Sequence, residues 1–240
     1  MKYLNQSLRH KWSIEIESAY VITLKDNEIS ERMSARCMRS CEKLGMPVQR
    51  WETFDGLKGD IKIPDHLTDR TWLRWIKVVN PALGKSEIAL VLAHATLWAH
   101  CCEIDKPIVI LEHDAVCVQK ITHHPAINAI CYLGSIEQVQ NKFQFGPIPI
   151  MGQMNENYRF ILRTHAYSVD PLMAKRLLTD LLQHGISTSI DVLIRSDIYA
   201  QVQFGVYAFD MAEGLSTGWD KEDKKKNEGL MRIHNKLAYH

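Results

Sequence analysis

The amino-acid sequence predicts an α/β fold of three layers, in which helices cover both faces of a mostly parallel central sheet. Two observations support this prediction. Short apolar runs of strand type alternate with longer runs of helical character, and polar, glycine and proline residues separate them. Because ligands in such folds bind beyond the carboxyl ends of strands, we look for a site in the residues that follow each strand.

The first strand-helix unit lies near the start of this pattern. A strand is predicted over Ala19–Leu24, a short apolar run. A helix is expected within residues 26–45, because Glu28 and Glu31 are polar capping candidates near its start and Gly45 suits its end.

A second unit repeats the alternation. A strand is predicted over Val48–Phe54, the turn residues at 55–56 close it, and residues 57–85 show no regular pattern. Ser86 is expected to cap a long helix. That helix ends before the predicted strand Pro107–Glu112.

The later elements continue the pattern. Strands are predicted over Ala129–Gly134 and Tyr158–Val169. The helix that follows has the clearest boundaries, with Asp170 as its N-cap, Pro171 in its first turn and Gly185 at its end.

Composition and length fit one soluble domain of 240 residues, with 46% apolar and 24% charged residues. We divide it into an N-terminal extension at 1–18, a core at 19–219, and a charged connector with a C-terminal tail at 220–240. The net charge of +1 gives no reason to expect a polyanion over the whole surface. Six cysteines without a CxxC pair indicate free thiols.

The chain shows no segment of transmembrane type. Its longest apolar stretch, residues 88–102, contains His94 and His100 and is shorter than the roughly 20 residues that span a bilayer. The first residues lack the continuous apolar segment of a signal peptide. We therefore expect a cytoplasmic location.

Two carboxylates and an imidazole follow the buried strand that ends near residue 111, namely Glu112, His113 and Asp114. Burying an unpaired carboxylate is costly, so charges at this position need water, a cation or a ligand. A turn could bring Glu112 and Asp114 to one hard divalent cation, which could neutralise a diphosphate leaving group. An isolated acidic pair at this spacing also occurs by chance in solvated loops, so the surrounding sequence has to show whether this pair forms a cation site.

Four segments in order provide that context, because together they resemble glycosyltransferase family 25, the lipooligosaccharide and collagen-type galactosyltransferases. The first resembles the family's opening strand and helix, the second its second strand end, the third its long helix and acidic signature, and the fourth a later strand and helix. These segments are residues 21–46, 52–56, 86–116, and 163–178 together with 189–194. They cover most of residues 19–194.

The resemblance implies a GT-A (Rossmann-like) fold, a nucleotide-diphosphate sugar donor such as a UDP-hexose, and inverting transfer of a hexose, galactose or glucose, to a glycan hydroxyl. It implies Asp114 as the first ligand of Mn²⁺ or Mg²⁺ and as one of the catalytic residues, and Glu112 as a second metal ligand or a contact of the ribose. The donor-binding residues that it implies are Thr23, Lys25, Arg32, Asp55, Gly56, Glu87, His94, Glu112, His113, His165 and Tyr167.

Several positions depart from the family pattern or have an ordinary alternative. His113 stands where the family usually has a third carboxylate, so the choice of metal is open: the imidazole could ligate a softer transition ion, or, as we favour, hydrogen-bond the ribose or point away. Ser86 replaces the family's glycine before the helix glutamate. His94 lies in an apolar helix and also suits ordinary core packing. His165 and Tyr167 share one face of a strand, which either packs or lines the donor cleft.

The acceptor side rests on fewer residues. An inverting displacement needs a base, for which Asp191 is our candidate, although a carboxylate there also suits the first turn of a helix. Trp72 and Trp75 could stack on a sugar ring while Arg74 supplies charge, yet this spacing is also that of ordinary packing.

Three other functions stay open on the sequence alone. Aromatic and basic residues together also suit a flipped, hydroxylated nucleic-acid base as acceptor. His113 could mark a decayed metal site in an inactive nucleotide-sugar-binding relative. A metal-dependent hydrolase could use the same carboxylates. Oligomeric state is not predicted.

Overall fold

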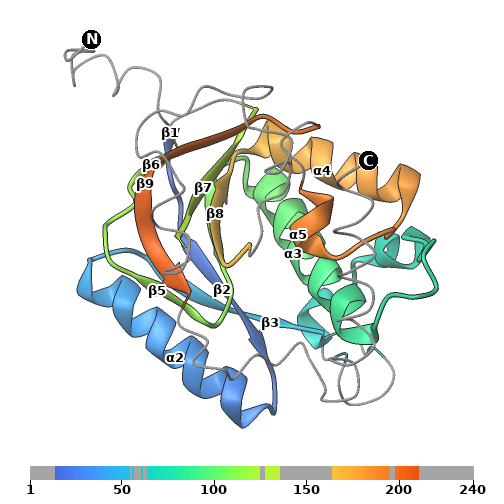
Figure 1. Ribbon diagram of the computed structural model, residues 1–240, viewed down its shortest axis with the longest axis horizontal. Coiled ribbons are helices and arrows are strands. Elements are labelled where there is room, and N and C mark those ends of the chain that lie inside the picture. The colour runs from blue at the N-terminus through green and yellow to red at the C-terminus, as the bar shows by residue number, and fades with distance from the viewer. Residues whose placement is uncertain are drawn as a thin grey trace, which may run out of the picture.

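A computed structural model describes residues 14–54, 56, 61, 64–124, 128–135, 164–194 and 198–210. Figure 1 shows a central sheet with α2 on one face and α3, α4 and α5 on the other. The strands are β1 Ile14–Glu15, β2 Ala19–Leu24, β3 Val48–Thr53, β4 Ile108–Leu111, β5 Ala115–Cys117, β6 His123–His124, β7 Ile130–Ser135, β8 Ala166–Val169 and β9 Gln201–Asp210. The helices are α2 Glu28–Lys43, α3 Lys85–Ile104, α4 Pro171–His184 and α5 Ile190–Leu193, with short 3₁₀ turns at Asp65–Leu67 and Thr71–Trp75.

The alternation of side chains along β2 explains the three layers. Tyr20 and Ile22 are buried in the core cluster that also contains α3 and α4, whereas Ala19 and Val21 are buried in the cluster that contains α2. A strand with apolar side chains on both sides needs cover on both faces. The predicted α/β architecture is therefore confirmed, and all six cysteines are free.

The main sheet is mixed, which corrects the prediction of a mostly parallel sheet. Its strand order is β3-β2-β4-β8-β7-β9-β5. β2 pairs in parallel with β3 and β4, and β7 pairs in parallel with β9. β8 runs antiparallel to both β4 and β7, and β5 antiparallel to β9.

Parallel pairing needs a crossover of a dozen or more residues, usually a helix. Only residues 112–114 connect β4 to β5, too few for such a crossover, and β5 accordingly runs opposite to β4 in the sheet. Apolar runs in the sequence predict strands but not their direction, which is why the prediction failed here.

Most element boundaries follow the predicted signals. β2 has the predicted bounds, and Asp170 caps α4 by accepting a 2.9 Å hydrogen bond from the Met173 backbone N–H. α2 also begins and ends near the predicted residues, but Asn27 is its N-cap, accepting a 3.0 Å hydrogen bond from the Ser30 backbone N–H.

α3 begins before the predicted cap Ser86. Its first residue is Lys85 and its N-cap is Gly84. Glu87 Oε2 accepts a 2.9 Å hydrogen bond from the Gly84 backbone N–H, so a carboxylate that reaches back satisfies this helix end. Glu87, predicted to bind the donor, is therefore engaged at a helix terminus.

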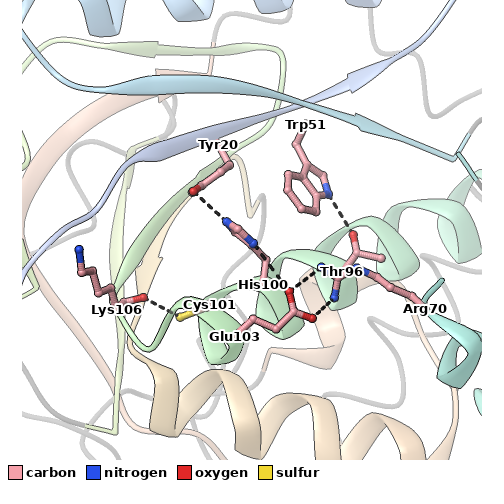
Figure 2. A network of polar contacts seen from close by, with 8 residues as sticks. All are labelled: Tyr20, Trp51, Arg70, Thr96, His100, Cys101, Glu103 and Lys106. Atoms are coloured by element: carbon pink, nitrogen blue, oxygen red, sulfur yellow. Dashed lines mark hydrogen bonds and ion pairs between the residues drawn. The ribbon is translucent and has the colours of Figure 1, made fainter. Parts of the chain in front are cut away.

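Polar contacts hold α3 against β2 and β3 (Figure 2). His100 Nε2 lies 2.9 Å from the Tyr20 hydroxyl, and Trp51 Nε1 donates a 3.0 Å hydrogen bond to Thr96 Oγ1. These contacts fix the rotation of a helix that also carries His94, whose position matters for the site below.

α3 is the one helix of the described chain that is long and apolar enough to cross a bilayer by length and composition. Half of its residues are buried inside the fold. Core helices of globular proteins share this property, so the composition of α3 does not identify a membrane span.

Candidate active site

The candidate site lies where β4 ends. Glu112, His113 and Asp114 form the short turn between β4 and β5, and the Ala115 backbone N–H donates to the Glu112 carbonyl at 3.1 Å. The Glu112 backbone N–H donates to the His165 carbonyl at 2.9 Å, so the turn lies against the beginning of β8.

Thr164 joins two carboxylates in this site. Its hydroxyl oxygen lies 2.7 Å from Glu112 Oε1 and 3.1 Å from Asp191 Oδ1. Its backbone N–H donates a 2.8 Å hydrogen bond to Asp191 Oδ1. Because a hydroxyl has one hydrogen, it can donate to only one of the two carboxylates at a time. The turn after β4 and the first turn of α5 therefore meet at one side chain.

The pKa values of the two carboxylates move in opposite directions. Burial, together with the charge of Glu112, raises the pKa of Asp191 to about 6, although the hydrogen bond from the Thr164 backbone N–H opposes this. Burial also acts to raise the pKa of Glu112, but interaction with His94 and the hydrogen bond from Thr164 outweigh it, so that pKa is lowered. Acid-base catalysis commonly separates two carboxyl groups in this way.

His94 is oriented by two buried aromatic residues. Trp98 Nε1 donates a 3.0 Å hydrogen bond to the Tyr167 hydroxyl, and that hydroxyl lies 2.7 Å from His94 Nδ1. The indole can only donate, so the tyrosine hydroxyl accepts from it. His94 Nε2 lies 3.7 Å from Glu112 Oε1, and because a carboxylate can only accept, we assign the proton of neutral His94 to Nε2, so that the hydroxyl donates to Nδ1. His94 therefore both packs in the core and faces the site.

His113 points toward α2. Its Nδ1 lies 3.0 Å from Ser30 Oγ, which also accepts a 2.9 Å hydrogen bond from the Leu24 backbone N–H. Burial lowers the pKa of His113, which favours the neutral imidazole. His113 thus ties the turn after β4 to the junction of β2 and α2.

Two further donor-side residues have structural roles. The buried hydroxyl of Thr23 donates to the Val21 carbonyl at 3.1 Å. Gly56 lies so close to the backbone of Lys85 and Ser86 that a Cβ atom at this position would overlap it. Asp55 lies outside the described residues.

The basic and tryptophan residues predicted to bind the donor or the acceptor are exposed or half-buried. Lys25 forms a 3.8 Å ion pair with Glu52, and Arg32 is exposed. Trp72 is half-buried and packs against the core, whereas Trp75 and Arg74 are exposed.

His165 is buried beneath Gly134, and its ring packs edge-on against Tyr132 with centroids 6.1 Å apart. The structure therefore brings Glu112, His94, Tyr167 and Asp191 into one connected network and places His165 beside them.

Sequence reasoning gave no role to three residues that hold this network, namely Thr164, Trp98 and Ser30. For Trp98 a signal existed, since it lies four residues after His94 on a predicted helix and therefore on the same face. Thr164 and Ser30 become visible only when distant segments are placed side by side.

The acidic pair fits a cation only in part. In the described chain, no group of three or more His, Cys, Asp or Glu side chains is arranged to hold a metal ion. Glu112 and Asp114 nevertheless offer hard oxygen ligands, and one Asp114 oxygen is buried in the turn. Mg²⁺ commonly takes one or two carboxylates and completes its shell with phosphate oxygens and water. Glu112 and Asp114 therefore supply two of the ligands that such an ion would need.

Comparison with known proteins identifies a family. Residues 16–194 match the family model described as glycosyltransferase family 25 (LPS biosynthesis protein). This region includes β2 through α5, and with them every residue of the network around Thr164. No curated protein matches the chain.

Proposed function

Since this chain belongs to glycosyltransferase family 25 and is a glycosyltransferase, we propose that it moves a hexose from a UDP-sugar to a glycan hydroxyl with inversion. The observation that carries this proposal is the meeting of Glu112, Thr164 and Asp191 at the end of β4. A donor sugar placed beyond this strand end would lie beside all three.

Asp191 is the proposed general base. The acceptor oxygen attacks the anomeric carbon, the bond from that carbon to the diphosphate oxygen breaks, and the proton of the acceptor passes to an Asp191 oxygen. The raised pKa of Asp191, about 6, agrees with this role because a base works best when its pKa is near the operating pH. Thr164 holds one Asp191 oxygen by two contacts, which leaves the other for the acceptor.

Glu112 and Asp114 would hold the proposed Mn²⁺ or Mg²⁺, which supplies positive charge to the leaving diphosphate. His94 faces Glu112 through Nε2 and would restrict the orientation of that carboxylate. Lys25 and Arg32, both exposed near the end of β2 and the start of α2, are the proposed cations for the donor phosphates.

The first test measures donor binding. Thermal unfolding of the full chain is followed with a panel of nucleotide sugars, with and without Mn²⁺, and compared with Asp114→Ala. A ligand at 100 times its dissociation constant should add about 2.7 kcal/mol to the free energy of unfolding. A Mn²⁺-dependent shift with one UDP-sugar that is lost in Asp114→Ala supports the proposed donor site. A cooperative protein that no donor stabilises refutes it.

The second test measures transfer. Asp191→Asn should retain the donor-induced thermal shift and lose about 100-fold or more in kcat, because a general base contributes about that factor. Glu42→Gln, an exposed carboxylate near the end of α2, is the matched control and should keep full activity. Sugar release to water at the same rate with and without acceptor would identify a hydrolase instead.

A further inference from the structure

An exposed surface of mixed apolar and basic character precedes α3. It consists of Arg74, Trp75, Lys77, Val78 and Val79, here called the 74–79 surface. The exposed fractions of Trp75, Val78 and Val79 are 65%, 46% and 52%. Three of the eight large hydrophobic residues that are exposed in the described chain therefore fall within five consecutive positions. Single exposed apolar residues are ordinary, but a contiguous group marks an interaction surface.

The backbone holds these side chains outward. The Val79 N–H donates to the Ile186 carbonyl at 3.0 Å, and the Ile186 N–H donates to the Lys77 carbonyl at 2.7 Å. Leu73 is buried and Ile76 packs against the core, so the inward positions of this segment are already taken. Turning the exposed side chains inward would break these contacts.

The two cations of the 74–79 surface are available to an outside partner. Arg74 and Lys77 are exposed, and within the described residues neither forms an ion pair. Nearby Arg70 differs, because it donates to both carboxylate oxygens of Glu103 (Figure 2). The surface therefore combines unneutralised positive charge with exposed tryptophan and valine.

We propose that the 74–79 surface docks on an anionic phospholipid membrane. Tryptophan favours the boundary between headgroups and acyl chains, valine enters the apolar side of that boundary, and arginine and lysine bind the anionic headgroups. A protein partner would also use the exposed tryptophan and arginine, but lysine is depleted at protein–protein interfaces, whereas it contributes to the binding of anionic headgroups as arginine does.

The position of the surface relates docking to catalysis. Ile186, which pairs with Val78, lies five residues before Asp191 in the chain. Docking would hold this side of the enzyme at the membrane, where an acceptor that carries a lipid would present its glycan. The inference goes beyond the proposed function, since it rests on the exposed surface alone. It gives Trp75 and Arg74 a role other than the sugar binding that the sequence suggested.

Co-sedimentation with vesicles tests the proposal. The full chain is mixed with vesicles of phosphatidylcholine and phosphatidylglycerol in equal parts, or of phosphatidylcholine alone. We expect binding to the anionic vesicles that weakens as salt is raised. Arg74→Gln with Lys77→Gln should lower the partition coefficient about fivefold for each cation, and Trp75→Ala should lower it about tenfold.

Matched variants separate this surface from general charge and hydrophobicity. Arg39→Gln with Lys43→Gln removes two exposed cations from α2, and Leu172→Ala removes an exposed apolar side chain from α4. Both should bind vesicles as the unaltered chain does.

Three results would overturn the proposal. The first is that the unaltered chain does not bind anionic vesicles. The second is that the control variants lose as much vesicle binding as the variants of the 74–79 surface. The third is that Trp75→Ala binds vesicles as before but raises KM for a water-soluble glycan acceptor. The last result would assign Trp75 to the acceptor site. Because vesicle binding needs no sugar donor, its failure is distinguishable from failure of the proposed transfer reaction.

Discussion

Removing the Tyr167 hydroxyl tests the hydrogen bonds that orient His94 toward Glu112. In Tyr167→Phe, Trp98 Nε1 loses the acceptor of its 3.0 Å bond and His94 Nδ1 loses the donor of its 2.7 Å bond. Both groups belong to side chains that are fully buried, so water cannot easily replace the hydroxyl. Each buried group left without its partner costs about 1–3 kcal/mol. We expect the free energy of unfolding to fall by about 3 kcal/mol.

Urea unfolding of the full chain measures this loss, and a second tyrosine provides the control. The Tyr199 hydroxyl donates a 3.0 Å hydrogen bond to Asp180 Oδ2 in a partly buried pair. Because Asp180 can take water instead, Tyr199→Phe should cost only about 1 kcal/mol.

A double-mutant cycle isolates the contact between the two aromatic residues. In a Trp98→Phe background the indole donor is already absent, so Tyr167→Phe should cost about 1 kcal/mol less than in the unaltered chain. Two results would refute the proposed hydrogen bonds from Trp98 to Tyr167 and from Tyr167 to His94. One is that the losses of stability in Trp98→Phe and Tyr167→Phe simply add in the double variant, and the other is that Tyr167→Phe loses no more stability than Tyr199→Phe.

Two further predictions concern stability. Gly56→Ala should lower the free energy of unfolding by about 1–3 kcal/mol in urea, because the new Cβ would overlap the Lys85 backbone, whereas Gly84→Ala, with ordinary contact at 3.6 Å, should cost less than about 1 kcal/mol. If both cost the same, close approach is not the reason. Burial lowers the pKa of His124 from 6.5 to about 4. The unfolded chain then binds the extra proton between these values, so the stabilisation is complete above pH 6.5 and is lost as the pH falls toward 4. This stabilisation is about 3 kcal/mol. In His124→Leu, the free energy of unfolding measured in urea should depend less steeply on pH between 4 and 6.5. An unchanged dependence on pH would contradict the lowered pKa of His124.

The fold could be predicted where local signals agree with packing. The apolar run of β2 and the pair Asp170 and Gly185 around α4 each have one favourable local interpretation, and the structure confirms them. The start of α3 could not be predicted from Ser86, because the Glu87 side chain reaches back to Gly84 and extends the helix. The sequence offered two possible caps for this helix, and the side-chain contact that selects Gly84 is seen only in the structure.

The candidate site was predictable to a smaller degree. Glu112, His94 and Asp191 were identified by residue type and by family resemblance, and the structure brings them together. Thr164, which joins two of them, is an ordinary threonine in sequence. Its importance depends on the order of strands in the sheet, which no local pattern contains.

The reversed direction of β8 determines which of its ends serves the site. Leu111 at the end of β4 is paired with Ala166 at the beginning of β8, so the chain enters this strand beside Glu112. If β8 ran parallel to β4, its first residue would lie at the opposite rim of the sheet, about 10 Å away, because the ends of a four-residue strand are three residue steps apart. The enzyme thus uses the entrance of one strand and the exit of its neighbour. Because β8 ends at the far rim, the chain returns along the sheet through α4, and α5 then places Asp191 at the rim where Thr164 lies.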